Sequence, residues 1–441
     1  MREHRNRAIH HRKRDMNRIE SLCRSARDVL LRALLLAGVV TGAAACNLDD
    51  LLNVDAPDRI PAEGLAVPSN AQLLVNGAVA DFECALGSYI ALSGVMAGEL
   101  TDATQTAARW PYDRRNVQSS DALYATSDCA ALGIYTPLSR ARWSADNVLG
   151  HLQRWSDAEV PNRQALIARA AAMAGYSFLL LAEGFCTAAV NQGPELQTAQ
   201  LLDSAIARFS TALTAAQAAN AADLVNLALV GRARANLDAG RGQQAVADAQ
   251  RVPASFEYTV SASAANARRN NRIFAQNGQG STGGTALSVG PAYRNVTYAG
   301  VADPRVAVVN ANRNSTDGTP LFFQTKYASL SAPIPLATGD EAQLIVAEVQ
   351  GGQTAVDIIN AFHARARIPA FAGGTADQIR AQVIEERRRE LFLEGHRFFD
   401  IRRLNLPLDP APGTAYRKGG LYGENRCFPL PDVERLNNPS M

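Results

Sequence analysis

Residues 378–404 read QIRAQVIEERRRELFLEGHRFFDIRRL, and this stretch decides the fold. Ile384, Leu391 and Phe398 recur at seven-residue spacing, which predicts one long helix with a buried apolar stripe. Charged residues crowd around that stripe, and every cation among them is arginine, the residue suited to forked, partly buried ion pairs. We therefore expect a structural charge network that fixes this helix to other helices. Its expected members are Glu386, Arg387, Glu390, Glu394, Arg397, Asp400 and Arg403.

The charge of the chain changes after its first segment. The whole sequence of 441 residues has a formal charge of +2, but residues 1–45 hold ten Lys or Arg and four Asp or Glu. Residues 46–441 then carry 34 basic and 38 acidic side chains, a net charge of −4. A mildly acidic chain lacks the basic surface that nucleic acid requires, so no nucleic-acid partner is expected.

Residues 1–45 are typical of an export signal. Arginines precede an apolar run at 33–45, which is too short to span a bilayer as a stable helix. The run ends in small residues before Cys46 and resembles the lipobox of bacterial lipoproteins, although Ala43 stands where a branched apolar residue is usual. We expect a lipidated Cys46 that anchors the chain to a membrane. Met16 is an alternative start, and an ordinary secretory signal with an incidental cysteine is the alternative reading.

Four cysteines remain after the expected anchor, and none forms a CxxC pair. A zinc site or a thioredoxin-type site is therefore not expected. An exported chain with an even number of cysteines favours two disulfides, for which three pairings are possible. We favour Cys84–Cys129, which links neighbouring segments, together with Cys186–Cys427, which tethers the C-terminal tail to the helical core.

The remaining chain predicts a tether at 46–70 and a single, mainly α-helical domain at 71–441. Alanine- and leucine-rich helical patterns fill 138–252 and 340–404, with short turns between them. ALVGRARANLDAGRGQQAVADAQRV, residues 228–252, is the clearest helix–turn–helix unit and suggests tetratricopeptide-like hairpins.

Other parts of the domain are less regular. An apolar stretch at 71–97 predicts a helix pair broken near Gly87. Residues 98–130 and 253–338 lose the helical period, and the second of these regions has the composition of short strands and loops. We expect ligand contacts in these two variable regions, because binding residues concentrate on loops carried by a rigid scaffold.

ERRRELFLEGHRFFDIRRL, residues 386–404, resembles the C-terminal signature of the SusD/RagB family of nutrient-binding outer-membrane lipoproteins. DPR at 303–305 and Lys326-Tyr327 are similar to further segments of that family, as are the helical stretches at 339–349 and 354–367. The resemblance implies a SusD-like fold with tetratricopeptide-like hairpins. It also implies a role as the lid and capture subunit of a SusC-like TonB-dependent β-barrel transporter in the outer membrane, with an oligosaccharide or another small nutrient as cargo.

Residue types suited to sugar binding occur in both variable regions. Sugars stack on flat aromatic rings and hydrogen-bond to planar polar groups, so Trp110 and Tyr112 with polar neighbours form the first candidate site. Simple packing of this loop onto the helices is the equal alternative. The full candidate set is Arg109, Trp110, Tyr112, Asp113 and Asn116 in the first region, and Tyr293, Asn295 and Tyr298 in the second. For the second group, packing is favoured over binding.

Catalytic residues are not expected. His151, His363 and His396 form no metal-binding spacing, and no GxSxG motif occurs. We expect neither cofactor nor metal, and a binding protein rather than an enzyme. Two alternatives stay open: a tetratricopeptide-type envelope scaffold that binds proteins, and a surface glycoside hydrolase, which requires two facing carboxylates in a cleft.

Overall fold

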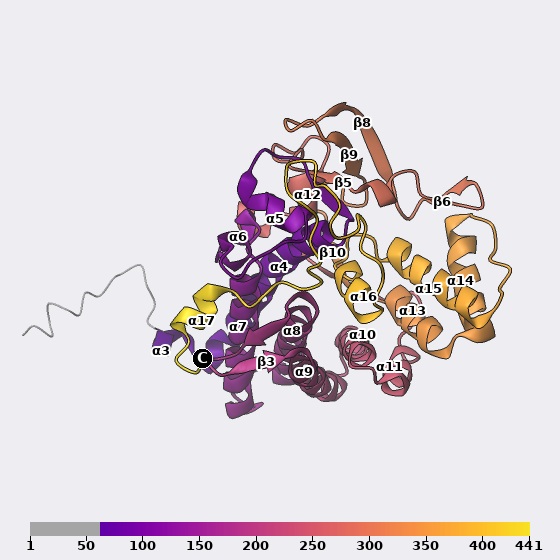
Figure 1. The fold of residues 1–441 in the computed structure, drawn as a ribbon. Coiled ribbons are helices and arrows are strands. Elements are labelled where there is room, and N and C mark those ends of the chain that lie inside the picture. Colours follow the sequence, from indigo (N-terminus) through magenta and orange to yellow (C-terminus); the bar gives the residue numbers. More distant parts are fainter. Residues whose placement is uncertain (1–61) are drawn as a thin grey trace, which may run out of the picture. The chain divides into compact units, whose positions relative to one another are not determined.

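The computed structural model describes residues 62–441 (Figure 1). The expected signal at 1–45, the lipidation site Cys46 and the first part of the expected tether lie outside these residues. Contacts divide the chain into Met1–Gly64 and Leu65–Met441, and the description below concerns the second unit. Two short segments, α3 (Ala62–Leu65) and η1 (Pro68–Asn70), precede its first long helix.

The first long helix, α4 (Ala71–Met96), is continuous, so the expected break near Gly87 is wrong. Every residue from Cys84 to Met96 is buried, because other elements surround this half of the helix. A Cβ atom on Gly87 would lie 3.1 Å from the Cβ atom of Arg272 in α12 (Arg272–Asn277). The glycine therefore allows a close approach between two helices and does not end one.

Helical hairpins form a layer that follows the chain, as the sequence predicts (Figure 1). Each helix packs on the next, and the order is α7 (Tyr135–Arg154), α8 (Arg163–Gly184), α9 (Thr198–Ala218), α10 (Ala222–Asp238) and α11 (Gly242–Ala249). Phe209 of α9 lies between two glycines, since a Cβ atom on Gly175 or Gly231 would approach its ring to 2.8 or 2.4 Å. Small residues thus set the close spacing of the hairpins.

Two of the described helical segments have the length and apolar composition of a membrane span, Pro68–Met96 and Arg163–Gly184. Their most apolar windows are 83% and 89% buried inside the protein. Burial on all sides explains why these helices are apolar around their whole circumference, so we interpret them as core helices.

Five small antiparallel sheets of two strands each supply the irregular part of the domain. The pairs are β1 (Leu100–Asp102) with β5 (Leu287–Val289), β2 (Thr187–Ala189) with β3 (Glu195–Gln197), β4 (Glu257–Val260) with β10 (Ile334–Thr338), β6 (Thr297–Tyr298) with β7 (Val301–Ala302), and β8 (Val308–Asn314) with β9 (Pro320–Gln324). Short helical turns connect them: η2 (Ala107–Arg109), α5 (Trp110–Asp113), α6 (Ala122–Ala125), η3 (Cys129–Ala131), η4 (Ala267–Arg269), η5 (Pro291–Tyr293) and, near the C-terminus, α17 (Asp432–Asn437).

Four helices close the fold: α13 (Gly339–Gln350), α14 (Gly352–Ala366), α15 (Ala376–Glu390) and α16 (Arg397–Arg403). The expected single helix over the signature is wrong, because a buried turn separates α15 from α16. Leu393 and Gly395 adopt positive φ angles of 55° and 89° in this turn. The Leu393 backbone N–H donates to the Glu99 carboxylate at 3.0 Å, and the Tyr327 hydroxyl donates to the Leu393 carbonyl at 2.9 Å.

The expected charge network forms, with one exception. Arg387 binds Asp400 at 3.0 Å, and Arg403 binds the same carboxylate at 2.6 Å and also Glu348. Burial alone would raise the pKa of Asp400, but Arg387 and Arg403 hold it well below its usual range. Further pairs are Glu386 with Arg305 and His363, Glu390 with Arg305 and Arg365, and Glu394 with Lys326.

Arg397 is the exception. It makes no hydrogen bond or ion pair with any residue in the described range 62–441, and its Nη1 atom is buried without a partner. The placement of Arg397 in the structural network is therefore wrong. It starts α16, directly after the buried turn, and its side chain lines a pocket.

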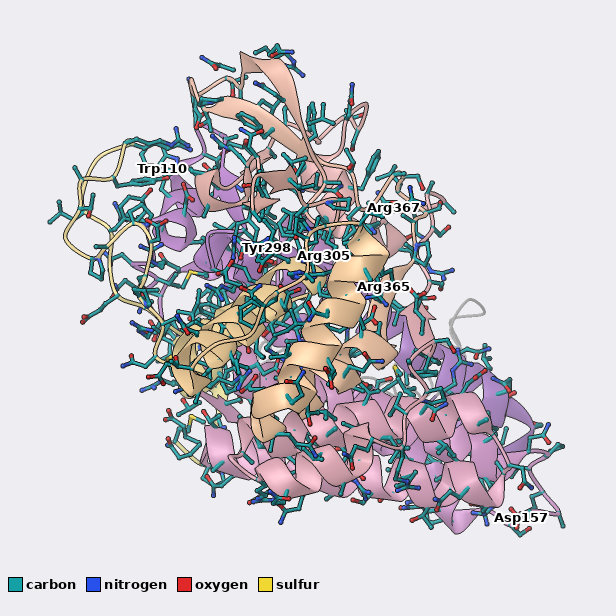
Figure 2. All side chains as sticks on the ribbon, turned by 90° about the vertical axis from the view of Figure 1, so that its right-hand side faces the viewer. Trp110, Asp157, Tyr298, Arg305, Arg365 and Arg367 are labelled. Atoms are coloured by element: carbon teal, nitrogen blue, oxygen red, sulfur yellow. A yellow bond between two sulfur atoms is a disulfide. The ribbon has the colours of Figure 1, made fainter. Side chains whose placement is uncertain are left out.

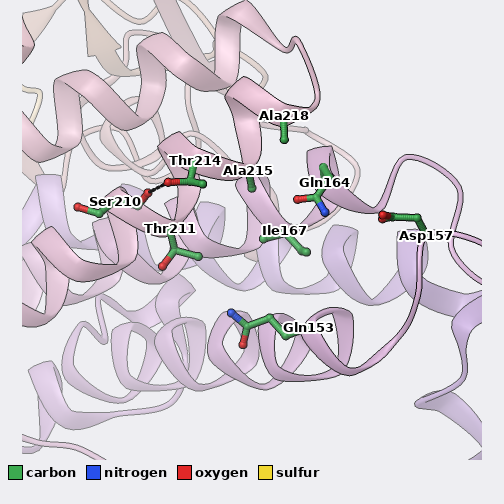
Figure 3. A pocket seen from close by; sticks show the side chains of 9 residues that line it. All are labelled: Gln153, Asp157, Gln164, Ile167, Ser210, Thr211, Thr214, Ala215 and Ala218. Atoms are coloured by element: carbon green, nitrogen blue, oxygen red, sulfur yellow. Dashed lines mark hydrogen bonds between the residues drawn. The ribbon is translucent and has the colours of Figure 1, made fainter.

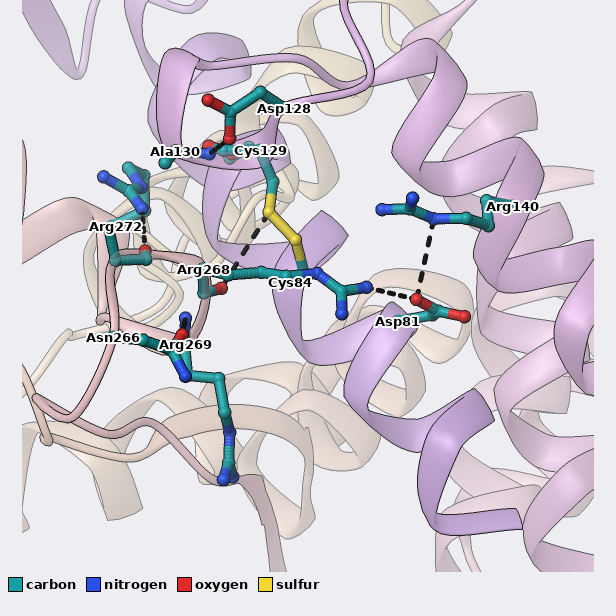
Figure 4. The surroundings of a disulfide bond; sticks show 12 residues. Asp81, Cys84, Asp128, Cys129, Ala130, Arg140, Asn266, Arg268, Arg269 and Arg272 are labelled. Carbon is teal, nitrogen blue, oxygen red and sulfur yellow. Dashed lines mark hydrogen bonds and ion pairs between the residues drawn. A yellow bond between two sulfur atoms is a disulfide. The ribbon is translucent and has the colours of Figure 1, made fainter. Parts of the chain in front are cut away.

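Two disulfides are present, Cys84–Cys129 and Cys186–Cys427, which is the pairing that the sequence favoured. The first joins α4 to η3, and Figure 4 shows it beside an ion pair between Arg268 of η4 and Asp81 of α4. The second closes a loop of 241 residues and fixes the C-terminal tail to the end of α8.

Candidate functional site

The candidate site is a pocket of about 550 Å³ where three distant parts of the chain meet. Its walls come from the end of α4 with β1, from the η5 turn, and from α15, α16 and the loop after α16. β1 and β5 hold the first two walls together, and the Gly290 backbone N–H donates to the Glu99 carbonyl at 2.8 Å. A Cβ atom on Gly290 would lie 2.0 Å from the Gly98 carbonyl oxygen, so this approach requires glycine.

Five arginines line the pocket, and three of them have ion-pair or hydrogen-bond partners within the protein. Arg388 binds Glu385 at 2.7 Å, Arg417 binds Asp317 at 2.9 Å, and Arg115 donates to the carbonyls of Asp409 and Pro410. These guanidinium groups shape the walls, and they hold the loop after α16 against the rest of the site.

The other two arginines, Arg294 and Arg397, have no carboxylate within ion-pair distance among the described residues. Arg294 donates through Nε to the Val289 carbonyl at 2.8 Å, and its guanidinium lies 4.2 Å from the centre of the Phe322 ring. Burial lowers the pKa of Arg294 because no anion compensates its charge. Both side chains therefore present hydrogen-bond donors that the protein itself does not use.

Buried polar atoms without a hydrogen-bond partner also gather around the pocket. They include Arg115 Nε, the Tyr293 hydroxyl, Thr319 Oγ1 and Arg397 Nη1. An unpaired buried polar atom costs about 1–3 kcal/mol, so such atoms are uncommon and need an explanation. Four such atoms lie on residues that line this one cavity, although each has almost no surface that a ligand can reach.

Three carboxylates line the same pocket. Glu385 is bound by Arg388 and Arg389, and although burial opposes this, the two arginines lower its pKa. Burial raises the pKa of Asp113, which accepts hydrogen bonds from the hydroxyls of Thr101 and Tyr416. Asp409 lies exposed at the rim.

The structure places only Asp113 of the first group of predicted binding residues in the pocket. Asp113 lines the pocket, but Tyr112 is fully buried against Tyr124 and Phe428, so its ring has no free face for a sugar. For Tyr112 the packing alternative holds, because the short helix α5 turns it toward the core. Arg109 donates to Gln276 at 2.8 Å, and Asn116 lies exposed beside Gln118.

Trp110 lies outside the pocket (Figure 2). Its ring is half-buried, its Nε1–H donates to the Thr104 carbonyl at 3.4 Å, and the Lys418 ammonium is 5.9 Å from the ring centre. Figure 2 shows it on the N-terminal segment, apart from Tyr298 and Arg305. Stacking on this ring is possible only at the surface of the loop.

Of the second predicted group, only Tyr293 lies in the pocket. Tyr293 lines the pocket with its ring stacked on Phe392 at 5.0 Å. Tyr298 packs edge-on against His363 at 4.4 Å, inside the charge network, and Asn295 is exposed on the turn between them. The structure thus brings together Asp113 and Tyr293 of the eight candidates.

Sequence reasoning missed most of the pocket. Arg294, Thr319 and Tyr422 were not among the candidates, and Arg397 was assigned to the network. One signal was available: Arg294 directly follows Tyr293, in a region already selected as variable. The other residues come from segments that only the folded chain brings together.

A broader hollow of about 760 Å³ lies on the helical layer (Figure 3). Its lining comes from α7, α8, α9 and the loop after α7: Gln153, Asp157, Gln164, Ile167, Ser210, Thr211, Thr214, Ala215 and Ala218. It contains no aromatic ring and no arginine, so it offers a sugar neither a stacking surface nor a charged donor. Within residues 62–441, no three His, Cys, Asp or Glu side chains are grouped to hold a metal ion.

Comparison with known proteins gives a consistent answer. Residues 341–428 match the SusD family model, and no curated protein matches the sequence. A SusD superfamily protein from Parabacteroides distasonis superposes with a TM-score of 0.64 at 15% identity, covering 84% of this chain and 98% of its own. A SusD-like carbohydrate binding protein from Bacteroides vulgatus gives 0.62 at 14%, covering 85% and 97%.

A laminarin binding SusD-like protein gives a TM-score of 0.64 at 16% identity, covering 84% of this chain and 98% of its own. At these identities the similarity to solved structures establishes the fold, while the family match lies on the C-terminal helices that carry the charge network. Fold and signature agree: the fold is similar to that of SusD superfamily proteins, and residues 341–428 match the SusD family model.

Proposed function

We propose that this protein captures an oligosaccharide at the cell surface, in the pocket between β1, η5 and α16. The observation that carries the proposal is one cavity of about 550 Å³ whose lining combines apolar residues with two arginines, Arg294 and Arg397, that have no carboxylate partner in the described chain. Ligand sites in proteins have volumes of roughly 300–1,000 Å³ and combine apolar walls with a few polar groups. Pro291, Pro410 and the ring of Tyr422 supply the apolar part.

Sugar rings suit such a wall, since they pair an apolar face with a rim of hydroxyl groups. Two fold relatives are named for carbohydrate and laminarin binding, which supports this class of ligand. Trp110 and Asp113 extend the proposed site toward the loop, where the Trp110 ring is half-buried.

We further propose that the protein is anchored in the outer membrane through Cys46 and delivers its cargo to a SusC-like TonB-dependent transporter. The lipobox-like run before Cys46 and the match to the SusD family model support this part. Co-purification of a large β-barrel with the full chain tests it, and a monomeric protein released without detergent would contradict it.

Binding without catalysis fits the pocket carboxylates. Arg388 and Arg389 hold Glu385 and lower its pKa, so Glu385 is unsuited to protonate a glycosidic oxygen. Release of reducing sugar from a bound oligosaccharide would instead favour the hydrolase alternative.

The test compares two cavity-filling variants in a glycan and peptide binding screen followed by calorimetry. Ala292 lines the pocket with an exposed side chain, and Ala218 does the same in the hollow on the helical layer. We expect Ala292→Trp to weaken glycan binding at least roughly tenfold, because the indole fills the cavity. Ala218→Trp should leave it unchanged.

If Ala218→Trp weakens binding and Ala292→Trp does not, the site lies on the helical layer, which would favour the protein-binding scaffold. Trp110→Ala tests the loop separately. Unchanged affinity in this variant would remove the Trp110 ring from the site without affecting the pocket.

A further inference from the structure

Resting on the proposed function, we infer that the pocket selects acidic oligosaccharides and binds the carboxylate of a uronic-acid unit through Arg294 and Arg397. Both side chains line the pocket, and neither forms an ion pair within residues 62–441. Elsewhere on the same helices, Arg387, Arg389 and Arg403 all have carboxylate partners.

Arg294 is held in a position that leaves one edge of its guanidinium free. Its Nε–H is fixed by the Val289 carbonyl, and its plane lies over the Phe322 ring. Nη1 and Nη2 make no hydrogen bond with the described chain and are not enclosed. Two parallel N–H donors in a fixed plane match the two oxygens of a carboxylate, which is the geometry of bidentate arginine recognition.

Arg397 supplies a second cation with no hydrogen bond to the described residues at all. Two carboxyl groups influence it through their charge, Glu99 and Glu385. Glu385 already binds Arg388 and Arg389, and Glu99 accepts the Leu393 N–H from behind the pocket wall. Neither neutralises Arg397 by direct contact, so an anion from outside gains the full interaction.

The charges of the side chains that line the pocket also favour an anionic ligand. Five arginines face three carboxylates, and only Asp409, at the exposed rim, is a carboxylate without a side-chain partner. A second cavity of about 380 Å³ shows the opposite balance, with four carboxylates against Lys326 and Arg365. The second cavity therefore lacks the surplus of positive charge that the proposed sugar site has.

A sugar carboxylate explains the lining better than an inorganic anion does. The ring of Tyr422, together with Pro291 and Pro410, covers an apolar ring face. A small free anion would use the two arginines and leave these apolar groups uncovered.

The experiment measures affinity by calorimetry for matched acidic and neutral ligands. Trigalacturonic acid is compared with its methyl ester, and glucuronic-acid-substituted xylotriose with xylotriose. The variants are Arg294→Met, Arg397→Met and, as a control, Arg380→Met on the exposed face of α15. Thermal unfolding of each variant establishes that it folds.

We expect at least one acidic ligand to bind roughly tenfold or more tightly than its neutral partner, because each charge-assisted contact is strong. Arg294→Met and Arg397→Met should each remove most of this preference, while Arg380→Met retains it. Added NaCl should reduce the acidic affinity more than the neutral affinity.

Three results would overturn the inference. Equal binding of acidic and neutral sugars, still blocked by Ala292→Trp, removes the charge selectivity and leaves the proposed function intact. A clear preference for a sulfated sugar, or for trialanine over trialanine amide, assigns the arginines to a different anion. Absence of any saccharide binding to the folded protein contradicts the proposed function itself.

Discussion

Arginines of the C-terminal helices serve two different regions of this molecule. In the network between α13, α15 and α16, Arg387 and Arg403 converge on the buried carboxylate of Asp400. In the pocket, Arg397 begins the same short helix and has no carboxylate partner in the described chain. The difference shows that α16 carries both an arginine of the network, Arg403, and an arginine without a carboxylate partner in the described chain, Arg397.

Removing the shared carboxylate of the charge network should have the largest effect on the free energy of unfolding. Asp400→Asn leaves two buried guanidinium groups without their shared anion, so we expect the free energy of unfolding to fall by about 3–5 kcal/mol. Chemical denaturation at pH 7 measures this loss. Asp357→Asn is the matched control, because Asp357 is exposed on α14 and contacts only Gln353. A change within about 0.5 kcal/mol for both variants would contradict the structural role of the network.

Glu99, a buried carboxyl near the pocket, differs from Asp400 of the network in the direction of its pKa shift. Burial raises the pKa of Glu99 to about 7 from its ordinary value of 4.5, although the Leu393 N–H and Arg397 lower it. Asp400 is shifted in the opposite direction, because arginines contact it directly. A raised carboxyl pKa means that the folded state binds the proton more tightly than the unfolded state, so stability is lost as pH rises from about 4.5 to about 7.

Glu99→Gln mimics the protonated form and keeps an acceptor for the Leu393 N–H. Relative to the wild type, we expect little change at pH 4.5 and a gain of about 3 kcal/mol at pH 8. Denaturation across this pH range measures the difference, with the exposed Glu424→Gln as control. A constant difference between wild type and Glu99→Gln at all pH values would show that Glu99 does not titrate in this range.

The scaffold could be predicted from sequence because its signals are local. Helical periodicity identifies the hairpins, and the concentration of arginine beside carboxylates identifies the network. Helix interruptions were harder to predict. Gly87 does not break α4, whereas the apolar residues around Leu393 conceal a turn. That turn depends on Glu99, Lys326 and Tyr327, which are distant in sequence, so periodicity within the signature could not reveal it.

The site was less predictable for the same reason. Aromatic side chains in irregular regions were reasonable candidates, yet Tyr112 packs into the core and Tyr298 packs on His363. The residues that do line the pocket come from α4, η5, α16 and the C-terminal loop, which only tertiary structure brings together. A sequence shows that arginine is abundant, but it does not show which arginine lacks a partner.

The smallest expected effect is therefore the most informative one. Arg397→Gln removes a cation that has no ion pair in the described structure and whose Nη1 atom is buried without a partner, so the free energy of unfolding should not fall. Arg387→Gln, ten residues earlier in the signature, should lower the free energy of unfolding by about 2–3 kcal/mol, because Asp400 then loses one of its two guanidinium partners. Equal losses in the two variants would place Arg397 in the network after all, whereas a clear difference separates the arginine that stabilises the fold from the arginine that is available to a ligand.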